Sequence, residues 1–142
     1  MTGQDVVVRP AVKGDLQRLA PLEREHQLWR GNVAGYFQDH LKKPNDHIVF
    51  VAEKAGRVVG FVYALREGSN ARLFYNFVYP GHLRQGIGEL LTKARIGHAR
   101  DVWHSQNVLV TFSDREKGVR HYAKFGFVKA AGGSDAVLRL RK

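Results

Sequence analysis

Hydrophobic residues in the first third of the chain recur at two spacings, which predict a strand followed by two helices. An apolar run over 6–9 stops at Pro10 and predicts the first strand. Beyond Asp15 an apolar stripe at helical spacing predicts a helix that ends at "RGN", residues 30–32. The stripe consists of Leu16, Leu19 and Leu22, followed at less regular spacing by His26 and Leu28. A second, shorter helix is predicted over 34–41.

The middle of the chain predicts strands joined by short turns. Apolar stretches over 48–53 and 57–65 flank the turn residues "KAG" and predict a hairpin. After a turn at "EGSNA", an aromatic-rich strand is predicted over 72–79, and it ends where Pro80 and Gly81 follow. We therefore expect three consecutive strands here.

The last third predicts alternating helices and strands. A helix is expected over 87–100, with an apolar face formed by Ile87, Leu90, Leu91 and Ala94. An apolar strand follows over 107–112, and the capping box of Ser113 and Glu116 opens a helix that ends at Gly126. Two final strands are predicted from "FVKA" and from residues 136–140. The order β-α-α-β-β-β-α-β-α-β-β predicts a single domain over 1–142 of the α/β (α+β) class, with helices flanking a mixed sheet.

Composition narrows the possible chemistry. The chain has 142 residues and a net charge of +10, and residues 115–142 hold eight Lys or Arg against two acids. A basic surface attracts anions such as nucleic acid, a membrane or a polyphosphate cofactor, although it can also be solvated without a partner. The lack of cysteine excludes disulfides, thiolate chemistry and Cys-type zinc sites. No apolar run is long enough to span a bilayer and no signal peptide is evident, so a cytoplasmic location is expected.

The stretch "HLRQGIGELL", residues 82–91, places two glycines between a predicted strand and a predicted helix. Such a turn is a general anion site, because backbone N–H groups converge at the positive end of the helix dipole. A P-loop is excluded, since Gly88 is followed by Glu89 rather than by Lys and Ser or Thr. A dinucleotide fingerprint is excluded, since Leu91 occupies the position of its third glycine.

The longer stretch "FVYPGHLRQGIGELL" resembles the acetyl-CoA-binding signature of the GNAT family of N-acetyltransferases. The matching residues are Val78, Pro80, Gly86, Ile87 and Gly88. The sequence departs from the signature at Leu83, where the family prefers Arg or Gln, but Arg84 and Gln85 follow directly. A second stretch, "HYAKFGF", resembles the family's other signature through Tyr122, Lys124, Gly126 and Phe127. The N-terminal "VVVRPAVKGDLQRL" also resembles the usual opening, so the resemblance covers nearly the whole chain.

The resemblance implies the GNAT acyl-CoA N-acyltransferase fold, with a mixed, mostly antiparallel sheet. It also implies transfer of the acetyl group of acetyl-CoA to a primary amine by direct attack in a ternary complex. The acceptor would be a small amine, an amino-acid derivative, or a protein lysine or N-terminus. The implied cofactor-binding residues are Phe77, Val78 and Tyr79 for pantetheine, and Leu83, Arg84, Gln85, Gly86, Ile87, Gly88 and Lys124 for the phosphates. A splay between the strand before the glycine turn and the strand over 107–112 would form the slot.

Tyr122 is the catalytic residue that the resemblance implies, since a phenol beside the sulfur can donate a proton to the thiolate leaving group. Its neighbour His121 is not expected as a partner, because adjacent helical residues point about 100° apart. A general base is harder to identify, since the strand "LFYNFVY" has no acid. Tyr75 or Asn76 lies nearest the expected place, and strand alternation lets only one of them face the site. The alternatives are Glu23, Glu25, His26 and His82, or no dedicated base.

The resemblance implies an acceptor pocket built from the first two helices, the strand turns and the C-terminal strands. Trp29, Tyr36 and Phe37 provide an aromatic wall that can hold a cation or a planar group, or that simply packs the helices. Asp39 and Asp46 can attract a cationic amine or be solvated. The substrate-binding candidates are Trp29, Tyr36, Tyr75 and Asn76. The expected state is a monomer or homodimer without metal or membrane association, and nucleic acid stays open as a partner. A non-catalytic module that binds CoA or nucleic acid is the alternative.

Overall fold

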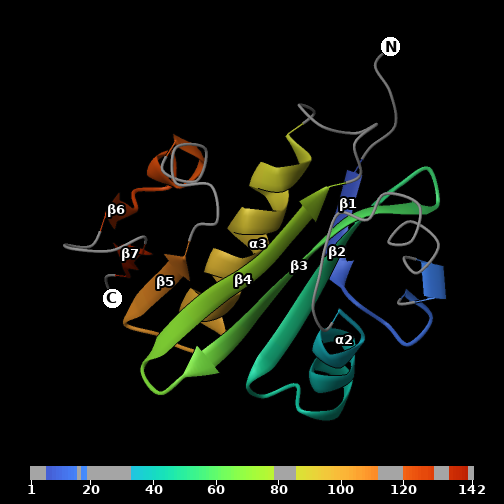
Figure 1. Ribbon diagram of the computed structural model, residues 1–142, viewed down its shortest axis with the longest axis horizontal. Coiled ribbons are helices and arrows are strands. Elements are labelled where there is room, and N and C mark those ends of the chain that lie inside the picture. Colours follow the sequence, from blue (N-terminus) through green and yellow to red (C-terminus); the bar gives the residue numbers. More distant parts are fainter. Residues whose placement is uncertain are drawn as a thin grey trace.

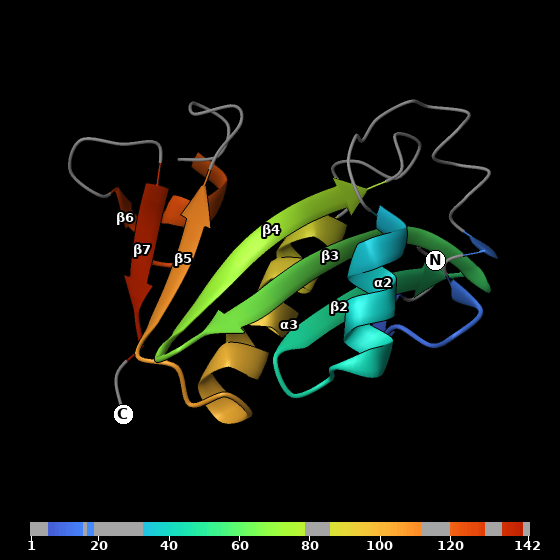
Figure 2. The same ribbon diagram turned by 60° about the horizontal axis from the view of Figure 1, so that its bottom comes forward.

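A seven-stranded sheet carries helix α2 (Val33–Lys42) on one face and helix α3 (Ile87–Asp101) on the other (Figures 1 and 2). The computed structural model describes residues 6–15, 17–18, 33–78, 86–111, 120–129 and 135–140. At residues 33, 34, 75–77, 111, 129 and 135 only the backbone is described. No helix within these ranges is both long and apolar enough to cross a membrane.

The strands lie in the order β1-β2-β3-β4-β5-β7-β6. Their bounds are β1 Val6–Pro10, β2 His47–Lys54, β3 Arg57–Glu67, β4 Asn70–Val78, β5 Asn107–Thr111, β6 Val128–Lys129 and β7 Asp135–Arg139. Strand β4 pairs in parallel with β5, and the other described pairs are antiparallel. The predicted mixed, mostly antiparallel sheet is therefore confirmed. Most of the first predicted helix, and the expected start of the helix before Gly126, lie outside the described residues.

The turns at both ends of β3 are tighter than the sequence predicts. Ala55 and Gly56 both have positive φ, 54° and 77°, which matches the twist of a two-residue hairpin turn. The turn before β4 contains only Gly68 and Ser69, so this strand begins at Asn70 rather than at residue 72. Strand β3 therefore forms one long hairpin with each of its neighbours.

The sheet is buried on both faces because the side chains of β2 and β3 alternate between two cores. Ile48, Phe50 and Ala52 pack into the core that contains α3. Val49 and Val51, in contrast, lie in the core that contains Phe37 of α2. This alternation is the period of two that a strand requires. The central strands thus form a rigid support for whatever binds at their ends.

Helix α3 buries most of the predicted face, since Ile87 and Leu91 are buried and Ala94 packs partly buried against the core. Its buried row runs at four-residue spacing through Ile87, Leu91, Arg95 and Ala99. Leu90 is 40% exposed, so its assignment to the apolar face was wrong. A charged residue, Arg95, occupies the buried row and is 1% exposed.

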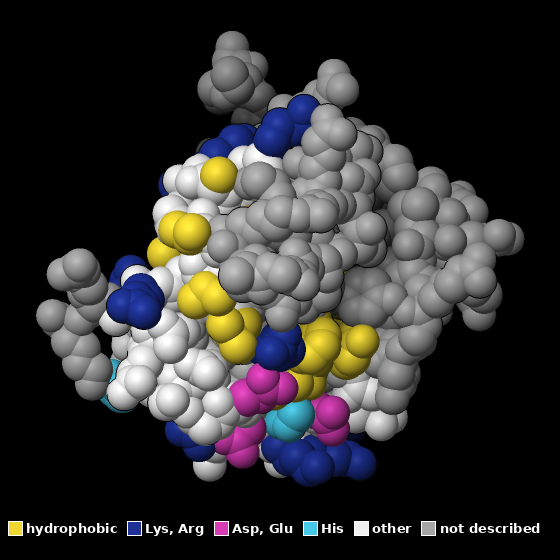
Figure 3. Space-filling model, turned by 60° about the vertical axis from the view of Figure 1, so that its left-hand side comes forward, with side chains coloured by type: hydrophobic (Ala, Val, Ile, Leu, Met, Phe, Trp, Pro, Cys, Tyr) yellow, Lys and Arg dark blue, Asp and Glu magenta, His cyan; other side chains and the backbone are white. Residues whose placement is uncertain are grey.

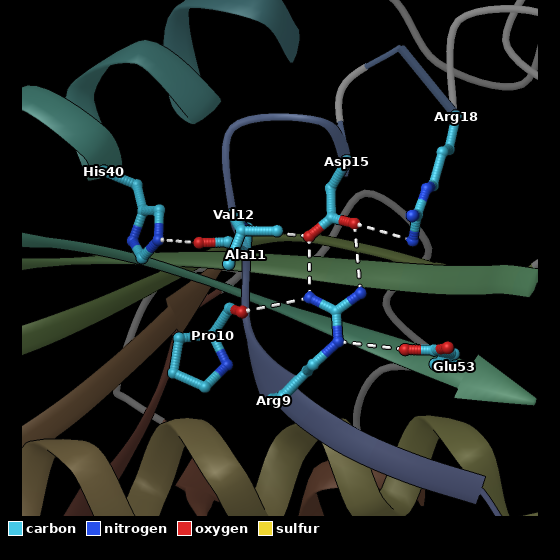
Figure 4. A network of polar contacts seen from close by, with 8 residues as sticks. All are labelled: Arg9, Pro10, Ala11, Val12, Asp15, Arg18, His40 and Glu53. Atoms are coloured by element: carbon cyan, nitrogen blue, oxygen red, sulfur yellow. Dashed lines mark hydrogen bonds and ion pairs between the residues drawn. The ribbon is translucent and has the colours of Figure 1, made fainter. Parts of the chain in front are cut away.

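Polar side chains fix the segment after β1 against α2 and β2 (Figure 4). The imidazole of His40 lies with Nε2 2.8 Å from the carbonyl oxygen of Ala11, and the backbone N–H of Val49 donates to its Nδ1 at 3.1 Å. Because Nδ1 accepts, the ring is the tautomer that carries its proton on Nε2. A single buried side chain on α2 therefore satisfies two backbone groups from two other segments.

Candidate functional site

Strands β4 and β5 pair over only part of their length. The ladder joins Asn70–Leu73 to Asn107–Val110, whereas β4 continues to Val78. Beyond Leu73 the two strands diverge, as Figures 1 and 2 both show. In the described part of the chain, the β5-facing backbone of β4 from Phe74 onward is not paired with another strand. An extended ligand can bind such an edge through main-chain hydrogen bonds, as an added strand would.

A β-bulge lies where this divergence begins. Val62 is paired with Asn76 and Ala64 with Leu73, so Phe74 and Tyr75 together oppose the single residue Tyr63. A bulge of two residues against one bends the strand and interrupts the ladder. The carbonyl oxygen of Tyr63 accepts a hydrogen bond from Nη1 of Arg95, at 3.4 Å. The candidates Tyr75 and Asn76 have their backbone at this bulge, and their side chains lie outside the described residues.

The glycine turn ends at the start of α3, as the sequence predicts. Gly86 precedes the helix with φ 79°, a left-handed conformation that favours glycine. A Cβ on Gly88 would meet only Cε1 of His121, 3.9 Å away. The N–H groups of a first helical turn have no partner within their helix, so they are suited to an anion.

The other loop candidates are described to different extents. Val78 packs partly buried against the α3-side core, and the backbone of Phe77 pairs with Phe61. Ile87 is buried in the first turn of α3 and anchors the glycine turn to the core. Four cofactor-binding candidates lie outside the described residues: Tyr79, Leu83, Arg84 and Gln85.

Tyr122 is buried beside α3 with its hydroxyl on a charged partner. Its side chain is 6% exposed, and Nη2 of Arg95 donates to its hydroxyl oxygen at 3.2 Å. The ring packs edge-on against Phe127, with centroids 5.2 Å apart. The tyrosine therefore has a fixed ring and a hydroxyl held next to the residue that also contacts the bulge.

His121 contacts Tyr122 through its ring and not through a hydrogen bond. The two rings meet edge-on with centroids 4.7 Å apart, and Nε2 of His121 lies 3.0 Å from Oγ1 of Thr92. Burial lowers the pKa of His121 below its usual value, and the nearby charges of Arg95 and Lys124 lower it further. The imidazole is thus neutral at neutral pH. It links the C-terminal helical turn, residues 120–123, to α3.

Lys124 reaches the first turn of α3. Its Nζ lies 3.0 Å from a carboxylate oxygen of Glu89, and both side chains are exposed. The hydrogen bond from Lys124 lowers the pKa of Glu89. The predicted phosphate-binding lysine is therefore placed beside the glycine turn, but a carboxylate at the same place offsets part of its charge.

Aromatic side chains cluster on the α2 side of the bulge. Tyr36 stacks on Tyr63 with centroids 4.3 Å apart, and Tyr63 contacts Phe74 at 5.8 Å. Nδ1 of His47 lies 2.7 Å from the hydroxyl oxygen of Tyr63. Burial, followed by the charge of Asp39, raises the pKa of Tyr63 to about 12, so this phenol stays neutral.

The aromatic residues predicted to form a wall differ in burial, so they do not all face the candidate site. Phe37 is 1% exposed and belongs to the core, which supports the packing interpretation for that residue. Phe74 is 43% exposed at the bulge and was missed, because an apolar residue in a predicted strand signals core. Asp46 forms an exposed ion pair with Arg66, 2.7 Å between Nη2 and Oδ1. Several candidates lie outside the described residues, namely Trp29, Glu23, Glu25, His26 and His82.

No cluster of metal-ligating side chains is found within the described ranges. The described polar groups near the bulge include the hydroxyls of Tyr63 and Tyr122, the imidazole of His47 and the guanidinium of Arg95. A phenol can donate a proton to a ligand group, and a guanidinium can orient one by hydrogen bonds.

Comparison with known proteins places this arrangement in a family. Residues 45–129 match the model of the acetyltransferase (GNAT) domain, a stretch that runs from before β2 to the end of β6. The chain is 36% identical over 87 residues to human N-acetyltransferase 8, a match that covers 56% of this chain and 38% of that relative. The chain therefore corresponds to well under half of the length of this relative.

Solved structures share the fold at low sequence identity. The ribosomal-protein-S18-alanine N-acetyltransferase from Escherichia coli superposes with a TM-score of 0.77 at 16% identity, covering 97% of this chain and 96% of that one. A spermidine N-acetyltransferase from Vibrio cholerae superposes with a TM-score of 0.72 at 15% identity, covering 94% and 93%. At such identities these likenesses concern the fold alone.

Proposed function

The chain belongs to the GNAT acetyltransferase family, and we propose on this basis that it transfers the acetyl group of acetyl-CoA to a primary amine. The observation that carries the proposal is the placement of Tyr122. Its hydroxyl is bound to Arg95, which also contacts the bulge where β4 leaves β5. These contacts support Tyr122 as the proton donor for a thioester bound along the unpaired edge of β4.

Acetyl-CoA would be held by backbone groups of the protein more than by side chains. Acetyl-CoA supplies the activated acetyl group as a thioester. The β5-facing edge of β4, including Phe77 and Val78, would bind the pantetheine arm. The N–H groups at Gly86, Ile87 and Gly88 would bind the pyrophosphate, with Lys124 beside them. Leu83, Arg84, Gln85 and Tyr79 are proposed to complete this loop.

The chemistry requires a proton at the leaving group. The acceptor nitrogen attacks the carbonyl carbon of the thioester, the C–S bond breaks, and its electron pair goes to sulfur. Tyr122 donates its phenolic proton to that sulfur. No acid occurs in "LFYNFVY", so the acceptor is proposed to react as the neutral amine present at mildly alkaline pH.

The acceptor is proposed to be a cationic or peptide amine bound against the aromatic cluster. Phe74 is exposed at the bulge, Tyr36 is half-buried on α2, and Asp39 is near enough to influence Tyr63. Aromatic faces and a carboxylate favour an amine that is protonated in solution. Trp29, Tyr75 and Asn76 are proposed to line the same site. The structural neighbours named for spermidine and for the alanine of ribosomal protein S18 suggest the probes.

A nucleic-acid role receives less support. In the view of Figure 3, the described Lys and Arg side chains are interrupted by acidic and hydrophobic ones. Nucleic acid binds best to continuous basic surfaces. We propose that residues 1–142 form one domain that acts in the cytoplasm as a monomer or homodimer.

The test combines binding with turnover. Saturating acetyl-CoA should raise the melting temperature, because a ligand that binds only the folded state stabilises it. Free-thiol release should then be followed with spermidine, a peptide that begins with alanine, and a peptide with an internal lysine. Turnover with at least one acceptor is expected. A cofactor-induced shift without turnover on any primary amine would favour the non-catalytic module, and no shift at all would overturn cofactor binding.

A further inference from the structure

Arg95 is a cation placed in the core of the protein. It lies on the buried row of α3 and is 1% exposed, whereas Arg100, one turn further on, is exposed. Burying a guanidinium is costly unless its N–H groups are bound, so this position demands specific partners. Its described partners are the carbonyl oxygen of Tyr63 at 3.4 Å and the hydroxyl of Tyr122 at 3.2 Å.

These two partners belong to the two parts of the proposed site. Tyr63 is the residue opposite the bulge of β4, and Tyr122 is the proposed proton donor. One guanidinium therefore bridges the bulge and the phenol. Because the two Nη atoms share one rigid plane, the bridge also sets where the phenolic oxygen lies relative to the bulge.

The direction of the hydrogen bond matters for the chemistry. A guanidinium only donates, so the oxygen of Tyr122 must accept from Arg95. The phenolic proton is therefore directed away from Arg95, toward a different acceptor. When that proton leaves, the negative charge on the oxygen forms beside a fixed cation in a poorly solvated place, where electrostatic stabilisation is strong.

We propose that Arg95 is a positioning residue for acid catalysis: it holds Tyr122 with its proton directed at the leaving sulfur and stabilises the phenolate that results. The inference rests on the proposed function. In the step, the N–C bond forms, the C–S bond breaks with its electrons going to sulfur, and the phenolic proton moves to sulfur. The proton that the acceptor nitrogen loses then restores the phenol through solvent.

The surrounding groups are compatible with this role. Burial lowers the pKa of Arg95 below its usual value, while the contact with Tyr122 acts in the opposite direction, and a guanidinium stays charged at neutral pH. His121 beside it is neutral at that pH, and Lys124 pairs with Glu89. The charged guanidinium of Arg95 is thus in direct contact with the hydroxyl of Tyr122.

The test is a double-mutant cycle with Arg95→Met and Tyr122→Phe, using acetyl-CoA and the acceptor that gives turnover in the amine panel. Arg95→Met should lower kcat about ten- to hundredfold, the range of a hydrogen bond to a charged group, while KM for acetyl-CoA changes little. In the Tyr122→Phe background the same substitution should change kcat by less than about twofold, because its partner is already absent. Arg95→Lys retains the charge and should restore part of the loss. Arg100→Met, on the same helix but exposed, is the matched control and should leave kcat unchanged.

Failure of this inference can be told apart from failure of the proposed function. If the wild-type protein turns over and Arg95→Met loses the same factor with and without Tyr122, or loses nothing, Arg95 does not act through the phenol. If Arg95→Met does not fold, Arg95→Lys decides, since a kcat loss confined to the Tyr122 background supports the inference and an equal loss in both backgrounds overturns it. If the wild-type protein binds acetyl-CoA but acetylates no amine, the proposed function itself falls.

Discussion

The guanidinium of Arg9 and the carboxylate of Asp15 form a bidentate ion pair across the segment that follows β1. Nη1 lies 2.8 Å from Oδ2 and Nη2 lies 3.1 Å from Oδ1 (Figure 4). Asp15 is fully buried, and its Oδ2 also accepts from the backbone N–H of Val12 at 2.8 Å. Glu53 of β2 binds Nε of the same arginine at 3.0 Å. One arginine thus joins the strand, the following segment and β2.

Asp15→Asn should lower the free energy of unfolding by about 3 kcal/mol, because it removes the charge from a buried pair. Burial alone would raise the pKa of Asp15, but the hydrogen bonds from Arg9 and Val12 outweigh it and the pKa is lowered. This stability is therefore present above the unfolded value of 3.8 and is lost as the pH falls through the lower folded value. Urea unfolding at pH 7 and at successively lower pH should show wild type and variant converging in acid.

Asp46→Asn is the matched control for this substitution. Asp46 pairs with Arg66 across an exposed surface, so its loss should cost less than about 1 kcal/mol. An Asp15→Asn effect no larger than that of the control would contradict the importance of the buried pair.

Gly86→Val should weaken acetyl-CoA binding much more than it weakens the fold. A valine at φ 79° costs about 1–2 kcal/mol of backbone strain, and its side chain would cover the N–H groups of the turn. Gly56→Val provides the comparison, since Gly56 has φ 77° in the turn between β2 and β3. Calorimetric titration with acetyl-CoA should show lost affinity at Gly86 alone. Equal affinity of the two variants would mean that the glycine turn has only a conformational role.

Tyr122→Phe should slow acetyl transfer by about a hundredfold or more, the usual contribution of a positioned general acid. The ring contact with Phe127 is retained, so the affinity for acetyl-CoA should change little, although the loss of a partner for the buried Arg95 should lower the free energy of unfolding. Steady-state kinetics of thiol release measures the change in kcat, and a separate titration measures the affinity for acetyl-CoA. An unchanged kcat would remove Tyr122 from the proton-transfer step.

Lys124→Met should weaken acetyl-CoA binding a few-fold, and the loss should shrink as salt is added, since exposed charges are screened. Glu89→Gln should act in the opposite direction, because Glu89 holds Lys124 and places a negative charge beside the glycine turn. Lys43→Met removes an exposed cation from the turn after α2 and is the control. The affinity for acetyl-CoA, measured at low and high salt, should be lower for Lys124→Met and higher for Glu89→Gln. If Lys124→Met weakens binding no more than Lys43→Met does, Lys124 has no specific role in cofactor binding.

The sequence by itself determined the parts of this protein that depend on neighbours along the chain. The hairpin turn at Ala55 and Gly56, the alternation of β2 and the glycine turn before α3 follow from local conformational preference and from a period of two or 3.6 residues. The two motifs containing Gly86 and Tyr122 were sufficient to indicate the family. These features need no knowledge of what packs against them.

Tertiary structure decided the features that depend on contacts between distant segments. The four-residue row from Ile87 and Leu91 to Ala99 passes through Arg95, yet a charged residue is normally assigned to solvent, so Leu90 was placed on the buried face instead. The bulge opposite Tyr63 arises from the register of two strands, which a single strand does not encode. Arg95 becomes a partner of Tyr122 only because the core brings α3, β3 and the C-terminal helical turn together, and the cost of burying its charge makes those contacts necessary.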